Sequence, residues 1–122
     1  MNTVQDHLDK ARRNRDFLNS LTVTDTNADW AIVVLFYRAL HLVRAYIHYS
    51  GNSHGTNHSI TINEVNNLFP QHLSMSYQRL YSRSRLYRYD DLEAAAMDYA
   101  QLESNDFQPL LTHVKGTLHG AV

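Results

Sequence analysis

One short segment, residues 79–91 (RLYSRSRLYRYDD), gathers side chains that recognise phosphates and nucleobases. It holds four arginines and three tyrosines, and two aspartates end it. Arginine binds phosphate through paired hydrogen bonds, and both arginine and tyrosine stack on unpaired bases. If the segment is a helix end, it offers a recognition surface, whose candidate binding residues are Arg83, Arg85, Arg88 and Tyr89.

An ion-paired interpretation of the same arginines remains open. Residues 79–88 contain four basic side chains and no acid, whereas residues 90–106 contain six acids and no base. Adjacent helices of opposite charge can pair with each other. In that case the arginines contact Asp90, Asp91 and Glu93, and the chain is an interaction module indifferent to nucleic acid.

A polar stripe along the apolar segment 28–50 gives the second set of candidates. At 100° per residue, six side chains fall near one line of such a helix, namely Trp30, Val34, Tyr37, His41, Arg44 and His48. Burying arginine and histidine without partners costs several kcal/mol, so these groups must face acids, tyrosines, a second copy or a groove. His41 can transfer protons near neutral pH or serve as a satisfied structural histidine. We add Arg44 and His48 to the binding candidates.

Other chemistries find little support in the residues. The chain has no cysteine, which excludes disulfides, thiolate catalysis and cysteine zinc sites. His54 and His58 lie in GNSHGTNHS with Glu64 nearby, but Gly55 and Asn57 indicate a loop, and no HExxH pattern occurs. We predict no metal site and no cofactor, and the roles of His54 and His58 stay open. Serine-nucleophile, phosphate-loop and dinucleotide motifs are absent.

The elements that must position these candidates are helical throughout. Glycine and proline are scarce and no run alternates with period two. The predicted helices span 3–20, 28–50, 60–68, 72–88 and 91–104, followed by a last helix that Ser104 or Asn105 caps. Ile60, Ile62, Val65 and Leu68 are expected to face inward from the short third helix. The sequence predicts one all-α domain over residues 1–122, a four- to five-helix up-and-down antiparallel bundle with a long buried central helix.

Charge and hydropathy limit the partners and the compartment. The formal net charge of −1 excludes strong overall attraction to nucleic acid or acidic membranes, so such binding needs a local patch. The apolar stretch 30–47 is interrupted by Arg38, His41 and Arg44, which favours a buried helix over a membrane span. The N-terminal residues lack the apolar core of a signal peptide, and we expect a cytoplasmic protein that does not bind membranes.

Three segments together resemble the small HEPN-domain proteins. They are FYRALH (36–41) on the apolar segment, the histidine loop HGTNHS (54–59), and the run from Tyr77 and Leu80 to Arg88-Tyr89-Asp90. The resemblance covers about residues 30–90. It implies a helical bundle that forms homodimers, and in many members a metal-independent RNase paired with a nucleotidyltransferase antitoxin.

The chain departs from the arginine–histidine signature of those RNases, in which four to six residues separate the two. The window after Arg83 holds Arg88, Tyr89 and Asp90, and no arginine here has a histidine at that spacing. Arginine cannot exchange protons near pH 7. We therefore expect a non-catalytic module that binds RNA, a nucleotide or a protein. The alternative is a divergent RNase that uses His41 with Arg83 or Arg88.

Overall fold

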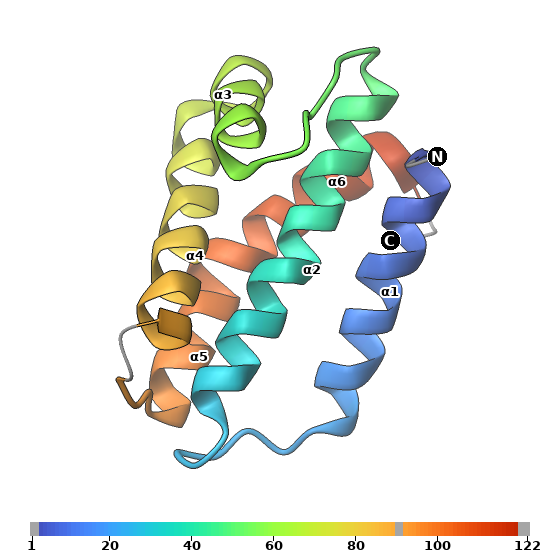
Figure 1. The fold of residues 1–122 in the computed structure, drawn as a ribbon. Helices are drawn as coiled ribbons and strands as arrows, with labels where there is room; N and C mark the ends of the chain where they lie inside the picture. The colour runs from blue at the N-terminus through green and yellow to red at the C-terminus, as the bar shows by residue number, and fades with distance from the viewer. Residues whose placement is uncertain (1–2, 90–91, 120–122) are drawn as a thin grey trace.

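The computed structural model describes residues 3–89 and 92–119, and all of its regular elements there are helices (Figure 1). The elements are α1 (Val4–Ser20), α2 (Ala28–Tyr49), α3 (His58–Leu68), α4 (Gln71–Tyr89), α5 (Ala96–Leu102), the π-helical turn η1 (Glu103–Phe107) and α6 (Gln108–Leu118). The predicted all-α class and the long buried central helix are confirmed.

The helices form an up-and-down bundle around α2. In Figure 1, α1 and α4 run antiparallel to α2 on either side of it, and the continuous run α5–η1–α6 returns behind them. The short helix α3 caps the end at which α2 finishes and α4 begins. Helix α2 packs most extensively against α1 and α4 and also contacts every other element. Every functional candidate therefore sits on, or next to, this central helix.

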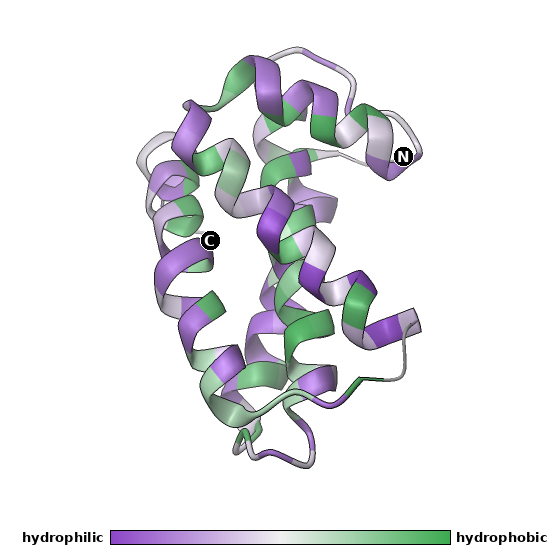
Figure 2. Cartoon of the chain, turned by 90° about the vertical axis from the view of Figure 1, so that its left-hand side faces the viewer, coloured by the Kyte–Doolittle hydropathy of each residue, from purple (hydrophilic) through white to green (hydrophobic). Residues whose placement is uncertain are grey.

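Helix α2 is central because its sequence is apolar on most sides. Ala31, Ile32, Leu35 and Ile47 are fully buried, and a helix of this kind is stable only between neighbours. Its length and composition alone would also suit a membrane span, a test that core helices of soluble proteins pass as well. The surrounding helices alternate hydrophobic and hydrophilic residues along their length, as Figure 2 shows, and cover it with their apolar faces.

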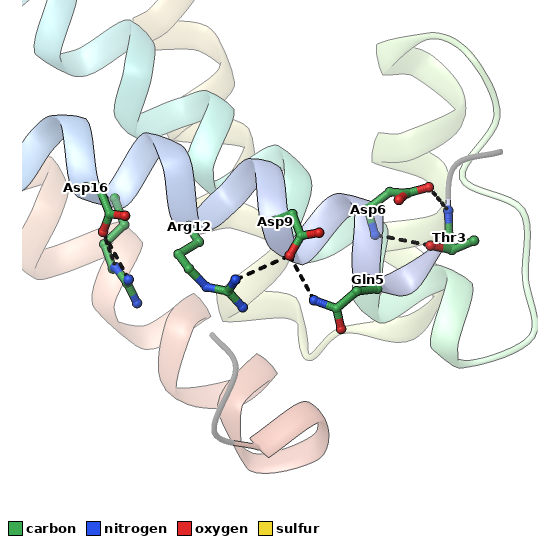
Figure 3. A network of polar contacts seen from close by, with 7 residues as sticks. Thr3, Gln5, Asp6, Asp9, Arg12 and Asp16 are labelled. Carbon is green, nitrogen blue, oxygen red and sulfur yellow. Dashed lines mark hydrogen bonds and ion pairs between the residues drawn. The ribbon is translucent and has the colours of Figure 1, made fainter.

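Helix α1 is fixed at its first turn by a reciprocal cap. The Asp6 backbone N–H donates to the Thr3 hydroxyl, and the Thr3 N–H donates to the Asp6 carboxylate, each at 3.1 Å (Figure 3). These bonds satisfy donors that a helix start leaves free. The cap holds the first turn, which carries His7 into the bundle.

The fifth predicted helix starts later than expected. Helix α5 begins at Ala96, not near residue 91, and Leu92, which the predicted helix included, is exposed and lies before it. The start is set by two carboxylates, since Asp98 accepts from the Ala95 N–H and Asp25 accepts from the Ala96 N–H, both at 2.8 Å. These bonds tie the helix start to the loop between α1 and α2.

Two further predictions were wrong. Ser104 and Asn105 cap no helix, because helical hydrogen bonding continues through η1 into α6. Ile60 is exposed on α3, where Thr61 and Val65 are the buried residues. The helix starts at His58, two residues earlier than predicted, with the Asn57 side chain as its cap.

Candidate functional site

Two of the predicted arginines form one cluster with tyrosines at the end of α4. The guanidinium groups of Arg85 and Arg88 each lie 5.1 Å from the ring centre of Tyr89. Arg85 also donates to the Tyr81 hydroxyl at 3.3 Å, and Arg88 donates to the hydroxyl of Tyr37 on α2. We call these five residues (Tyr37, Tyr81, Arg85, Arg88 and Tyr89) the arginine–tyrosine cluster.

The cluster contains no ion pair. Within residues 3–89 and 92–119, ion pairs involve only Arg12, Arg15 and Arg79 among the basic residues. The predicted partners Asp90 and Asp91 lie outside the described residues, and Glu93 is exposed without an ion pair. Among the described residues, the two guanidinium groups contact tyrosine rings and hydroxyls, and most of their N–H donors have no acceptor there.

A hollow of about 250 Å³ lies beside Arg88. Its walls are Asp29, Trp30, Val33, Tyr87 and Arg88. The Trp30 side chain is 66% exposed, which is unusual for the largest aromatic residue, and it stands at the start of α2. An exposed aromatic wall next to an arginine suits a stacked base. The sequence pattern placed Trp30 on the polar stripe but did not single it out.

Arg83 lies apart from this cluster. It lines a different hollow of about 380 Å³ together with Arg79, Tyr87 and Asp106. There the Arg79 guanidinium donates from Nε and Nη2 to one carboxylate oxygen of Asp106, at 2.8 and 2.7 Å. Asp106 is only 5% exposed, so Arg79 neutralises a buried carboxylate. This side of α4 is a structural contact between α4 and η1.

The polar stripe of α2 faces α1, α3 and the loop between α2 and α3. Tyr37, His41 and Arg44 are half-buried, and His48 is exposed. The Arg44 Nε donates to the Thr61 hydroxyl at 3.2 Å, and that hydroxyl donates to the backbone oxygen of His54 at 3.0 Å. Burial lowers the pKa of Arg44, while Tyr77 and Tyr37 partly offset this. Its terminal nitrogens have no protein partner among the described residues.

Three histidines from three segments form a chain of ring-to-ring hydrogen bonds. The His41 Nδ1 lies 3.1 Å from the Nδ1 of His7, and the His7 Nε2 lies 3.0 Å from the Nε2 of His54. At the far end, the His54 Nδ1 lies 2.6 Å from the Gly55 carbonyl oxygen. We call His41, His7 and His54 the histidine chain. It ties α2, α1 and the 51–57 loop together.

The Gly55 carbonyl fixes every proton in the neutral chain. A carbonyl only accepts, so His54 carries its proton on Nδ1 and accepts at Nε2. His7 must then donate from Nε2 and accept at Nδ1, and His41 must donate from Nδ1. This leaves the His41 Nε2 as a lone pair. That atom has no protein partner, and it is not among the fully buried unpaired atoms, so solvent reaches it.

The chain is neutral near pH 7. Burial first, and then His54 and Arg44, lower the pKa of His7 to about 4. Burial and then His7 lower the pKa of His41 to about 4. The pKa of His54 is lowered as well, again chiefly by burial. The charged groups that act most strongly on His7 and His41 are basic, while Asp6 on the first turn of α1 also interacts with His7.

The loop that carries His54 has a demanding conformation. Gly55 has a φ of +70°, and a Cβ atom there would lie 2.5 Å from the Ile60 side chain. Only glycine fits both requirements. Beside the loop, His54 and His48 line an open hollow of about 500 Å³. His48 therefore lies next to the histidine chain but is not a link in it.

Sequence reasoning missed the residues that support the predicted ones. It did not single out His7 as a partner of His41, nor Tyr81 as a partner of Arg85. His7 is only 1% exposed, and a histidine on the buried stripe of α1 was a signal that the sequence did contain. The contact between His7 and His54 depends on the packing of α1 against the 51–57 loop, which the sequence does not reveal.

His58 connects the two groups of candidates. Its ring lies 5.1 Å from that of Tyr81, and the nearby cations Arg44, Arg85 and Arg88 contribute to lowering its pKa after burial. Its Nδ1 is buried without a partner among the described residues. One continuous basic and aromatic band therefore runs from the arginine–tyrosine cluster past His58 to Arg44 and His41.

In the described part of the chain, no three histidine or acidic residues are arranged to hold a metal ion. His7 uses opposite ring nitrogens toward its two neighbours, so the three rings do not converge on one point. His54, His58 and Glu64, which lie close in sequence, form no ligand set within the described residues either. In comparisons with known proteins, no family model, no curated protein and no solved structure matches this chain.

Proposed function

We propose that this chain is a non-catalytic, HEPN-like helical module that binds RNA or a nucleotide through its arginine–tyrosine cluster. One observation carries the proposal: Arg85 and Arg88 are held by tyrosine rings and have no ion pair within the described residues. Arginines that serve the fold are expected to meet acids, as Arg79 does. Guanidinium and phenol groups without acids suit phosphates and stacked bases.

The neighbouring groups extend this surface in both directions. Trp30 stands on one side of Arg88, and His58 and Arg44 follow on the other. The net charge of −1 offers no general attraction to polyanions, so a local band must supply it. A band of this kind predicts binding to single-stranded RNA with strong salt dependence and little sequence preference.

The experiment is a salt series of fluorescence anisotropy with a labelled single-stranded oligouridylate. The double variant Arg85→Glu with Arg88→Glu should abolish binding at moderate salt. The matched control is Arg83→Glu with Lys115→Glu, which has the same change in net charge away from the band and should bind like wild type. No binding by wild type, or equal losses in both variants, would overturn the proposal.

We also propose that the chain forms a homodimer and acts in the cytoplasm. Several exposed large apolar side chains outside the arginine–tyrosine cluster, including Phe17, Met75 and Met97, leave surface for a second copy. Light scattering during size exclusion should give twice the mass of the chain. A nucleotidyltransferase antitoxin is the partner that the HEPN resemblance suggests, and co-purification with such a protein would test it.

A second candidate is a divergent, metal-independent RNase with His41 as the base. It is favoured by the free Nε2 of His41, because His7 orients the ring as a catalytic base requires. Arg83 is on another surface, so Arg44 or Arg88 would stabilise the phosphate. Purified protein should cleave RNA in the presence of a chelator, and His41→Gln should remove the activity while the helical signal is unchanged. Absence of cleavage over long incubation would eliminate this candidate.

A protein-binding module is the remaining alternative. The same salt series separates it from RNA binding, because a pure protein-binding module predicts no RNA affinity in any variant. The exposed aromatic residues Trp30 and Tyr89 would then be the contact, and Trp30→Ala should weaken the assembly measured by light scattering.

A further inference from the structure

Helix α2 presents one base and one cation side by side to solvent. His41 and Arg44 are three residues apart, which places them on adjacent turns of the same face. The His41 Nε2 and the terminal nitrogens of Arg44 have no protein partner among the described residues, and none of them is fully buried. An oxygen ligand that accepts from Arg44 would therefore meet the His41 ring.

The charged groups that act most strongly on His41 are basic. Helix α1 contributes His7, Lys10 and Arg13, and α2 itself contributes Arg44. The 51–57 loop adds His54 behind His7, and the acid Asp6 on α1 acts on His7. A negative group bound here would offset these charges, and it would favour a proton on His41.

The histidine chain determines where such a proton goes. His7 and His54 each accept a hydrogen bond on their only free ring nitrogen, so protonating either one breaks a link. His41 alone can take a proton at Nε2 while it still donates from Nδ1 to His7. The charged His41 then offers a second N–H toward solvent, next to the Arg44 guanidinium.

We propose that His41 and Arg44 form an oxyanion site that takes up one proton on His41 when a phosphate group binds. The inference rests on the proposed function, because the phosphate belongs to the RNA that the arginine–tyrosine cluster holds. The hydrogen bonds of the histidine chain direct the proton to the His41 Nε2, the atom that would face the phosphate. Binding should therefore strengthen as the pH falls.

The first test uses sulfate, which has the oxygens of phosphate but does not titrate near neutral pH. The pKa of His41 is followed by NMR of the histidine ring signals, with and without sulfate. In the free protein this pKa is well below its usual value. Sulfate should raise it by at least about one unit, and the shift should vanish in Arg44→Gln. An unchanged His41 pKa in wild type would overturn the proposal.

The second test measures oligouridylate binding from about pH 7.5 down to about pH 4, with circular dichroism as a check on the fold. Affinity should rise toward a tenfold gain per pH unit between the pKa of the bound state and that of the free state, which is the slope for one proton. His41→Gln retains an N–H donor for His7 and should lose the slope, whatever its affinity at pH 7.5. His48→Gln is the matched control and should keep the slope.

The two tests separate the inference from the function on which it rests. If wild type binds RNA at pH 7.5 but shows no slope, or if His41→Gln keeps it, the proton-coupled site is overturned and RNA binding stands. If no RNA binds at any pH, the proposed function fails, and the sulfate titration alone decides the oxyanion site. A sulfate shift caused by an adventitious ion only would persist in Arg44→Gln and would count against the site.

Discussion

The two sides of α4 use the same residue type in opposite ways. On one side, Arg79 donates twice to the buried carboxylate of Asp106, which joins α4 to η1. On the other side, Arg85 and Arg88 lie against tyrosine rings and make no ion pair within the described residues, although Asp29 lines the same hollow as Arg88. A sequence that contains four arginines within ten residues does not distinguish these uses. The partner residues, which come from elsewhere in the chain, make the difference.

This comparison separates stability from recognition. A buried acid requires a permanent cation, because an unpaired buried charge is costly. An arginine on an aromatic ring is held in place while its polar edge stays open. We therefore expect substitutions on the Asp106 side to change the free energy of unfolding, and substitutions on the tyrosine side to change affinity.

The largest effect is expected from Arg79→Ala. The Asp106 carboxylate would lose its cation in a buried site, so the free energy of unfolding should fall by about 2 kcal/mol. Urea unfolding measures it. Arg83→Ala, on the same helix and exposed, is the matched control and should change stability by less than about 0.5 kcal/mol. A fall of equal size in both variants would remove the distinction between the two sides.

The second largest effect is expected from acid, which should lower the free energy of unfolding through His7 and His41. The folded pKa values of His7 and His41, each about 4, lie below the unfolded value of 6.5. The unfolded chain therefore binds more protons, and stability is fully present above about pH 6.5 and is lost as the pH falls toward 4. We expect a loss on the order of 2 kcal/mol for the pair, after allowance for solvent screening.

Thermal unfolding across that pH range checks this expectation. His7→Gln should lose a large part of the dependence, whereas His72→Gln, an exposed histidine on α4 away from the chain, should keep it. A flat profile for wild type would contradict the neutral, hydrogen-bonded histidine chain.

Tyr89→Ala should act on binding with a smaller effect. The Tyr89 ring is 60% exposed and touches both cluster arginines, so its removal frees them and deletes a stacking surface. We expect oligouridylate affinity to fall about tenfold, which corresponds to one stacked base. Tyr89→Phe keeps the ring and should bind within about twofold of wild type. A similar loss in both variants would assign the effect to the hydroxyl.

The smallest effect should come from Arg88→Gln on stability. The substitution removes a contact with Tyr37 and also relieves repulsion from Arg85, so the two contributions oppose each other. The free energy of unfolding should change by less than about 0.5 kcal/mol. A larger loss in calorimetry would show that Arg88 serves the fold as Arg79 does.

The fold could be predicted largely because its signals are local. The long apolar run 30–47 lies within α2, Ser50-Gly51 follows the end of that helix, and Phe69-Pro70 separates α3 from α4. Gly51 has a φ of +83°, as a helix stop of this kind requires. The polar stripe of α2 was also recognisable, since it depends only on helical spacing.

The candidate site could be predicted only in part. The sequence identified Arg85, Arg88 and Tyr89 together, but it also included Arg83, which the turn of the helix sends to the Asp106 side. The histidine chain depends on three segments meeting, and no spacing rule connects His7 with His54. The predicted start of the fifth helix near residue 91 was wrong because Asp25, from a distant loop, fixes the helix start at Ala96.

The π-helical turn at Glu103–Phe107 adjusts the rotational phase of one long helix. The buried residues Leu102 and Phe107 are five positions apart, a spacing that a regular α-helix would place roughly 140° from each other. The wider turn brings both toward the core and keeps Leu110 and Val114 in line behind them. Removing one residue there would let the turn become regular α-helix, in which Leu102 and Phe107, then four positions apart, lie about 40° from each other and α6 keeps its phase. The bundle should therefore tolerate the deletion of one residue in this turn far better than a deletion in the regular helices beside it, which would turn the following segment by about 100°.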